Sequence, residues 1–160
     1  MAILSNAKTR VFIGGEFEGS YASDAAAVAA YEALTWTEIG NVSDLGEFGD
    51  EAQEITYEVL GEARVLKHKG VRDAGEVPLT CAFDRADAGQ TMLRQAANSS
   101  KRYAVKVELD DAPTGGTPTR YYFAVLVRSA RIGLGGANDI VELNAASSIT
   151  SAILEVPAEA

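Results

Sequence analysis

Short segments in which apolar and polar residues alternate are the feature that most constrains the fold of this chain. In residues 76–83 and 102–109 every second position is apolar, and these positions hold Val77, Leu79, Cys81, Phe83, Tyr103, Val105, Val107 and Leu109. A period of two places such residues on one face of a β-strand. Pro78 lacks a backbone donor, which predicts that 76–83 is an edge strand or the start of one.

Composition and turn residues predict five further strands. We expect them over residues 9–13, ended by Gly14 and Gly15, and over 35–42, 120–131, 139–145 and 149–156. Residues 110–118 predict a turn and 133–137 a bend. The 120–131 segment is apolar on both faces, which predicts burial on both sides by a packed sheet or by another subunit.

Two segments predict helices. Ser23 or Asp24 could cap a helix over 25–34, whose alanines favour helix but whose lack of large apolar residues predicts weak packing. Asp84 or Asp87 could cap a second, amphipathic helix. On that helix we expect one face to hold Leu93, Ala96 and Ala97 and the others to hold Gln90, Arg94 and Gln95.

Many short strands with one convincing helix indicate a mainly β fold, a β-sandwich or barrel with a flanking α-helix. A length of 160 residues fits one domain, and no proline-rich linker or repeat divides the sequence. We therefore expect residues 1–160 to form a single domain, with a long loop at about 43–75.

This long loop carries adjacent blocks of opposite charge. Its acidic part includes Asp44, Glu47, Asp50, Glu51, Glu54 and Glu58, and its basic part includes Arg64, Lys67, Lys69 and Arg72. Such blocks are usually solvated faces. The competing interpretation is a long hairpin whose two charge zones meet complementary zones on neighbouring copies.

The sequence does not predict an active site, a cofactor or a metal. His68 is the only histidine and lies between lysines, and the only cysteine, Cys81, belongs to an apolar strand. One histidine and one cysteine do not make a zinc site, and no calcium-loop spacing is present. Gly133, Gly135 and Gly136 do not match a nucleotide loop. A formal net charge of −9 argues against nucleic-acid binding.

Neither a signal peptide nor an apolar run approaching the ~20 residues of a membrane helix is visible in the sequence. We therefore expect the protein to be made in a reducing cytoplasm and to have no membrane partner.

Several short patterns in the region 36–97 resemble one protein family. They are Trp36-x-x-Ile39-x-x-Val42, then Phe48-Gly49, then Gly70 with Asp73-x-Gly75, and finally Asp87-x-Gly89-Gln90 ahead of the second helix. In this order and spacing they are similar to the major tail tube proteins of long-tailed bacteriophages, particularly those with flexible, non-contractile tails. The resemblance extends more weakly to the C-terminal strands.

This resemblance implies a structural role. It implies six copies in a ring, rings stacked head-to-tail into the tail tube, and a lumen through which genomic DNA is ejected without specific binding. The implied partners are other copies, a tape-measure protein and tail-tip or terminator proteins. The implied location is the virion tail, assembled in the bacterial host cytoplasm.

The resemblance also suggests which residues make contacts between copies. For contacts between rings, on the 43–75 loop, the candidates are Asp44, Glu47, Asp50, Glu51, Arg64, Lys67, Lys69 and Arg72. For packing between subunits, on the 120–131 strand, they are Tyr121, Tyr122, Phe123 and Leu126. The acidic and basic zones of the loop would suit head-to-tail stacking, in which two different faces of one protein must be complementary.

Two alternatives remain open from the sequence. Within the same class the chain could be a secretion-type tube protein or a tail terminator. From a different class it could be a small-ligand or carbohydrate-binding β-sandwich, whose marker would be an exposed aromatic platform.

Overall fold

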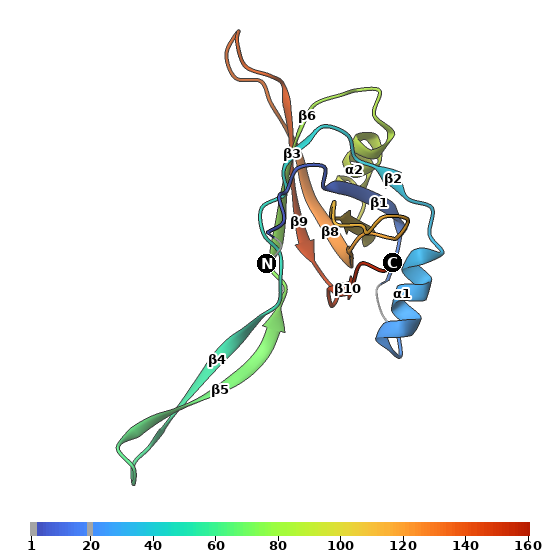
Figure 1. Cartoon of the computed structure of the whole chain (residues 1–160). Helices are drawn as coiled ribbons and strands as arrows, with labels where there is room; N and C mark the ends of the chain where they lie inside the picture. Colours follow the sequence, from blue (N-terminus) through green and yellow to red (C-terminus); the bar gives the residue numbers. More distant parts are fainter. Residues whose placement is uncertain (1–2, 19–20) are drawn as a thin grey trace.

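The computed structural model describes residues 3–18 and 21–160, which contain ten strands and two helices (Figure 1). The elements are β1 (Arg10–Glu16), α1 (Asp24–Glu32), β2 (Thr37–Glu38), β3 (Val42–Asp44), β4 (Glu51–Val59), β5 (Arg64–Asp73), β6 (Glu76–Ala82), α2 (Ala88–Ala97), β7 (Tyr103–Glu108), β8 (Arg120–Gly133), β9 (Glu142–Ile149) and β10 (Leu154–Val156). Eight strands form one antiparallel sheet in the order β2-β1-β7-β8-β9-β6-β3, with β10 beside β8. β4 and β5 form a separate hairpin.

The sheet curls toward a barrel because two successive strands lie at its opposite edges. β2 pairs with β1 at one edge, and β3 pairs with β6 at the other. The connecting residues 39–41 span at most ~14 Å from strand to strand. The Ile39 amide donates to the Val11 carbonyl on one side of this crossing, and the Asn41 carbonyl accepts from the Ala82 amide on the other. The two sheet edges therefore approach each other here.

The single strand predicted over 35–42 is thus wrong: the structure has β2 and β3 with a break between them. Asn41 provides the break, since its φ of 59° is a left-handed conformation that does not continue a strand. The prediction that Gly14 and Gly15 end the first strand is also wrong, because β1 continues to Glu16 through a register shift. Gly14 leaves room for Trp36, whose ring carbon would lie 3.2 Å from a Cβ at this position.

The concave face of the curled sheet holds the main core. The alternation predicted for 76–83 is confirmed, since Val77, Leu79 and Cys81 are buried in this core. Phe123 and Leu143 are fully buried beside them. Burying such side chains stabilises the fold by roughly 1.5–3 kcal/mol each. β6 is an inner strand at Cys81, but the β3 register ends at Thr80, so Pro78 lies where β6 has become an edge.

Helix α2 closes this core and is fixed by a polar cluster. Asp87 is the N-cap and accepts from the Gln90 amide at 2.8 Å, as well as from the Gly40 amide at 3.2 Å. Leu93 and Ala96 face the core as predicted. The prediction that Gln90 points away from the core is wrong, because its side chain is buried and bonds to the backbone around it.

Helix α1 covers part of the opposite, convex face of the sheet. Ser23 caps this helix by accepting from the Ala26 amide. The weak packing expected of the helix is not found at Tyr31, which is 1% exposed and lies against the rings of Phe17 and Tyr122 at 4.1 and 5.4 Å between centroids. One aromatic residue, together with the small size of the alanines, thus gives the helix a closely packed face.

Two hairpins project from the sheet in opposite directions (Figure 1). The β4–β5 hairpin extends at one end, and its strands pair only with each other among the described residues. At the other end β8 and β9 are joined by a turn at residues 134–141, which projects beyond their last paired residues, Gly133 and Glu142. The strand expected over 139–145 is β9, which begins at Glu142 and continues to Ile149. The strand expected over 149–156 is shorter: residues 150–153 are not in a strand, and β10 begins at Leu154, where it pairs with β8.

Candidate functional site

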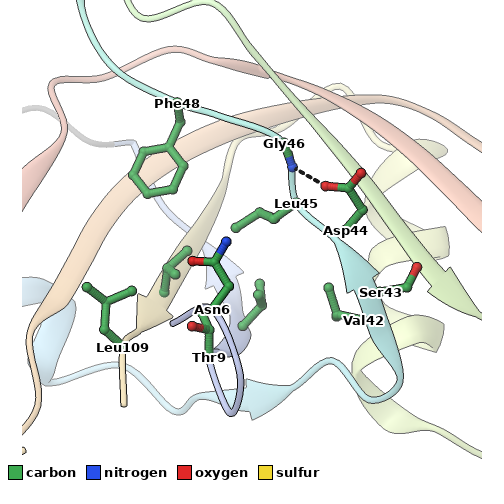
Figure 2. Close-up of a pocket in the computed structure, with 11 residues that line it drawn as sticks. Asn6, Thr9, Val42, Ser43, Asp44, Leu45, Gly46, Phe48 and Leu109 are labelled. Atoms are coloured by element: carbon green, nitrogen blue, oxygen red, sulfur yellow. Dashed lines mark hydrogen bonds between the residues drawn. The ribbon is translucent and has the colours of Figure 1, made fainter. Parts of the chain in front are cut away.

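A cleft of about 190 Å³ lies between the N-terminal segment, β3 with the chain that follows it, and the end of β7 (Figure 2). Its walls are part polar and part apolar, with the apolar Leu45 and Phe48 on one side and Leu109 on the other. Asp44 is the titratable residue of this lining, and its carboxylate accepts from the Gly46 amide at 2.8 Å. No second titratable side chain of the described residues lines the cleft beside it.

The histidine and the cysteine do not belong to the lining of this cleft. His68 is exposed on the β4–β5 hairpin, opposite Ile55. Cys81 is 0% exposed, and burial raises the pKa of its thiol to about 11, with a smaller effect from the Asp87 charge. A thiol that is protonated and buried is a poor nucleophile.

The described residues contain no group of three or more histidine, cysteine, aspartate or glutamate side chains placed to hold a metal ion. Among the same residues, no helix has the length and apolar character needed to cross a bilayer.

The ion pairs of the convex face stabilise the sheet. Arg10 donates to both carboxylate oxygens of Glu38, at 3.1 and 2.9 Å, and this hydrogen bonding holds the pKa of Glu38 below its ordinary value. Lys106 pairs with Glu108 at 3.0 Å, and its ammonium lies 4.1 Å from the centre of the Phe12 ring. The cationic groups of Arg10 and Lys106 thus already pair with carboxylates of the same chain.

The charged residues predicted for the long loop are all exposed. Asp44 ends β3, Glu47 and Asp50 lie in the connection to β4, Glu51 begins β4, and β5 holds Arg64, Lys67, Lys69 and Arg72. The structure thus makes this loop a long hairpin, and a role of its charge zones in contacts with neighbouring copies stays a prediction.

The acidic and basic zones face each other within this hairpin. In the register Glu54 lies opposite Lys69, and Lys67 forms an ion pair with Glu54 at 3.3 Å. Cross-strand pairing inside one copy therefore accounts for the acidic block being followed by a basic block in the sequence. An exposed pair of this kind contributes less than about 1 kcal/mol.

The opposite face of the hairpin is apolar, a feature that the sequence analysis missed. Ile55, Tyr57 and Leu66 lie on it and are 53%, 66% and 37% exposed. The signal was present in the sequence as alternation in 54–59, with Glu54, Thr56 and Glu58 on one face and Ile55, Tyr57 and Val59 on the other.

The four packing candidates of β8 fall into two groups. Tyr122 and Phe123 are 1% and 0% exposed, on opposite faces of the strand, so their proposed role in packing between subunits is corrected: their contacts lie within the chain. Helix α1 and the main core provide the two-sided burial that the sequence predicted. Tyr121 and Leu126 are half-buried and remain accessible to a second copy.

The turn of the β8–β9 hairpin is a second apolar projection that the sequence analysis missed. Ile132, Leu134 and Ile140 are 42%, 67% and 73% exposed. The turn is held by Gly135, with a φ of 63°, and by the Asp139 carboxylate, which accepts from the Gly136 amide at 2.6 Å. The sequence predicted the bend, and the apolar residues on both sides of it were the available signal.

No aromatic platform is formed by the described residues. Tyr21 and Tyr57 are the large aromatic side chains most exposed there, and they lie on separate parts of the molecule. A carbohydrate-binding surface would group such rings.

We compared the chain with known protein sequences and structures. No curated protein sequence matches the chain significantly. A chain in the cryo-EM structure of the anti-feeding prophage baseplate, six-fold symmetrised, is similar with a TM-score of 0.71 at 12% identity, over 98% of this chain and 97% of that chain. The SPP1 tail tube has a TM-score of 0.63 at 12% identity, over 97% and 80%. The PVC sheath/tube terminator has a TM-score of 0.64 at 13% identity, over 98% of both chains.

These structures share the fold of this chain, and the sequence itself identifies the family. The sequence profile described as "Phage tail tube protein, TTP" matches residues 5–153. The match spans both projecting hairpins, both helices and every strand of the curled sheet except β10. The chain belongs to the phage tail tube protein family and is a structural protein of the phage tail.

Proposed function

We propose that six copies of this protein form a ring and that the rings stack head-to-tail into the wall of a non-contractile phage tail tube. The observation that carries this proposal is the pair of hairpins that project in opposite directions with exposed apolar side chains (Figure 1). A stack needs two different surfaces at opposite ends of one protein. The six-fold symmetry given for the anti-feeding prophage baseplate supports the ring size.

In this proposal, residues 1–160 act as one tail-tube domain and the 43–75 region reaches the next ring. The candidates for that contact are Asp44, Glu47, Asp50, Glu51, Arg64, Lys67, Lys69 and Arg72, all of which are exposed. Their charges contribute modestly, because Lys67 already pairs with Glu54 in its own hairpin. Tyr121 and Leu126 are the remaining candidates for packing between subunits of one ring.

The tube would be the conduit for genomic DNA during ejection. A net charge of −9 per copy supports passage without specific binding, since phosphate is repelled by an acidic wall. Assembly would take place in the host cytoplasm, with a tape-measure protein inside the tube and with tail-tip and terminator proteins at its ends. Catalysis, a cofactor and a membrane are not part of this proposal.

Negative-stain electron microscopy of the concentrated protein tests the proposal. We expect rings or tubes, because the contacts lie on the protein itself. A strictly monomeric protein at high concentration, in the absence of any requirement for a tail-tip or chaperone partner, would contradict it.

The contribution of the arm charges is tested by Arg64→Glu combined with Lys67→Glu. We expect shorter tubes with an unchanged unfolding temperature, because both residues are exposed and lie on the arm. Lys8→Glu combined with Lys101→Glu makes the same charge change away from the arm and serves as the control. Equal tube lengths in the two variants would remove a local role for the arm charges.

A further inference from the structure

We infer that one specific contact joins successive rings: the apolar face of the β4–β5 hairpin of one copy packs on the apolar turn of the β8–β9 hairpin of a copy in the next ring. This inference rests on the proposed tube and specifies which surfaces of the protein meet in it. It assigns the main role to side chains outside the charged zones of the loop.

The first surface is a hairpin face that the protomer leaves uncovered. β4 and β5 pair through a continuous register from Glu54 opposite Lys69 to Val59 opposite Arg64. In this register Ile55, Tyr57 and Leu66 share one face. A two-stranded hairpin is marginally stable in water by itself, and a hydrophobic face normally packs on a partner. The exposure of these side chains therefore calls for a covering surface.

The second surface is the β8–β9 turn, which presents apolar side chains on a defined backbone. Leu134 and Ile140 are 67% and 73% exposed on either side of this turn. The hydrogen bond from the Gly136 amide to the Asp139 carboxylate closes the turn between them. Ordering this surface on contact therefore costs little additional entropy.

Position and charge identify the partner as a second copy of this chain. The two surfaces lie at opposite ends of the molecule, so each becomes available to the other when copies repeat along one direction (Figure 1). Strands of nine and ten residues extend the arm by ~30 Å, enough to reach beyond its own subunit.

The rim of the arm carries a basic residue, and the rim of the turn carries acidic residues beside the exposed Arg131. Arg64 flanks the apolar face of the arm, since it lies opposite Val59. The acidic Asp139 and Glu142 flank the β8–β9 turn, and both are exposed. Rim charges of this kind align two surfaces while the apolar centre supplies most of the affinity.

Cysteine cross-linking tests the contact in tubes of the full chain. One variant combines Tyr57→Cys with Leu134→Cys. Its matched control combines Thr56→Cys with Leu134→Cys, because Thr56 is the adjacent exposed residue and points to the charged face. The natural Cys81 does not compete, since it is fully buried and the pKa of its thiol is about 11.

After mild oxidation, a non-reducing gel of the Tyr57→Cys and Leu134→Cys variant should show a ladder of covalent multimers. Each copy would be linked to one neighbour on each side, whereas a mixture of the two single variants should give dimers alone. The Thr56→Cys control should give at least ten-fold less multimer. If Tyr57→Cys prevents assembly, His68→Cys on the same face replaces it, with Lys67→Cys as the control.

The outcomes separate this inference from the proposed tube. Tubes that form normally but cross-link no better through residue 57 than through residue 56 would overturn the contact and leave the proposed function intact. Unmodified protein that forms neither rings nor tubes would overturn the proposed function, and the contact with it.

Discussion

At the scale of single residues, the polar cluster around Gln90 shows how a family pattern acquires a physical meaning. The Gln90 side chain donates to the carbonyls of Gly40 and Ala82 at 3.0 and 2.9 Å, and it accepts from the Asp84 amide at 2.9 Å. Gly89 is required beside it, because a Cβ there would overlap the Glu38 carbonyl oxygen. The pattern Asp87-x-Gly89-Gln90 thus joins α2 to the crossing between β2 and β3.

Gln90→Leu should destabilise the protein by on the order of 2–3 kcal/mol, because it leaves three partly buried backbone groups without their partners. Chemical denaturation of the unassembled protein measures this change. Gln95→Leu is the matched control, since Gln95 is exposed on the same helix and the same substitution there should change stability by less than about 0.5 kcal/mol. Equal effects at both positions would show that the cluster contributes little.

The sequence revealed this cluster only in part. The cap at Asp87 and the core positions Leu93 and Ala96 follow from helical spacing and are confirmed. Gln90 was placed outside the core because glutamine is usually exposed and its partners are distant in sequence. A buried glutamine is recognised from the backbone groups it satisfies, and those are set by the tertiary fold.

At the scale of elements, local sequence patterns identified most strands and both helices, but they did not identify which strands pair with one another in the sheet. Residues 35–42 lack a clear local break, yet β2 and β3 belong to opposite sheet edges. Nothing local specifies such an exchange, because each edge is defined by strands far along the chain. The β4–β5 hairpin had a local signal in its charges, whose pairing partners lie across a short turn.

The β4–β5 hairpin should be the least protected part of the unassembled protein in amide hydrogen exchange. Its strands lack a second neighbour among the described elements, so local opening breaks few other contacts. Hydrogen exchange followed by mass spectrometry, on dilute protein and on tubes, measures protection over residues 51–73. We expect protection to increase at least ten-fold on assembly.

The β7 strand, Tyr103–Glu108, is the internal reference for this experiment, because it lies between β1 and β8 and should be protected in both states. Full protection of the arm in dilute, monomeric protein would show that the hairpin is stable without a covering partner.

At the scale of the whole molecule, the sequence identified the fold class and the family, and the structure added the surfaces. Alternation and turn spacing are sufficient for a curled antiparallel sheet, because they report local geometry. Which apolar residues remain exposed depends on what the rest of the chain covers. Tyr122 and Tyr57 show this, since both are tyrosines in strands, but α1 covers the first, whereas the second is 66% exposed.

Raising sodium chloride from about 0.1 M to about 1 M should promote assembly. Copies of net charge −9 repel one another, and the Debye length falls from ~10 to ~3 Å over this range. Apolar contacts between the hairpins are not weakened by this screening. Sedimentation of the assembled fraction at several salt concentrations measures the effect. Dissolution of tubes at high salt would instead show that paired charges dominate the stacking.

The opposite directions of the two hairpins have a consequence for growth. Any head-to-tail stack of this protein has two unlike ends, one presenting free arms and the other presenting free turns (Figure 1). A factor that starts the polymer and a factor that stops it must therefore recognise different surfaces. The asymmetry of a single copy thus gives the whole polymer a polarity.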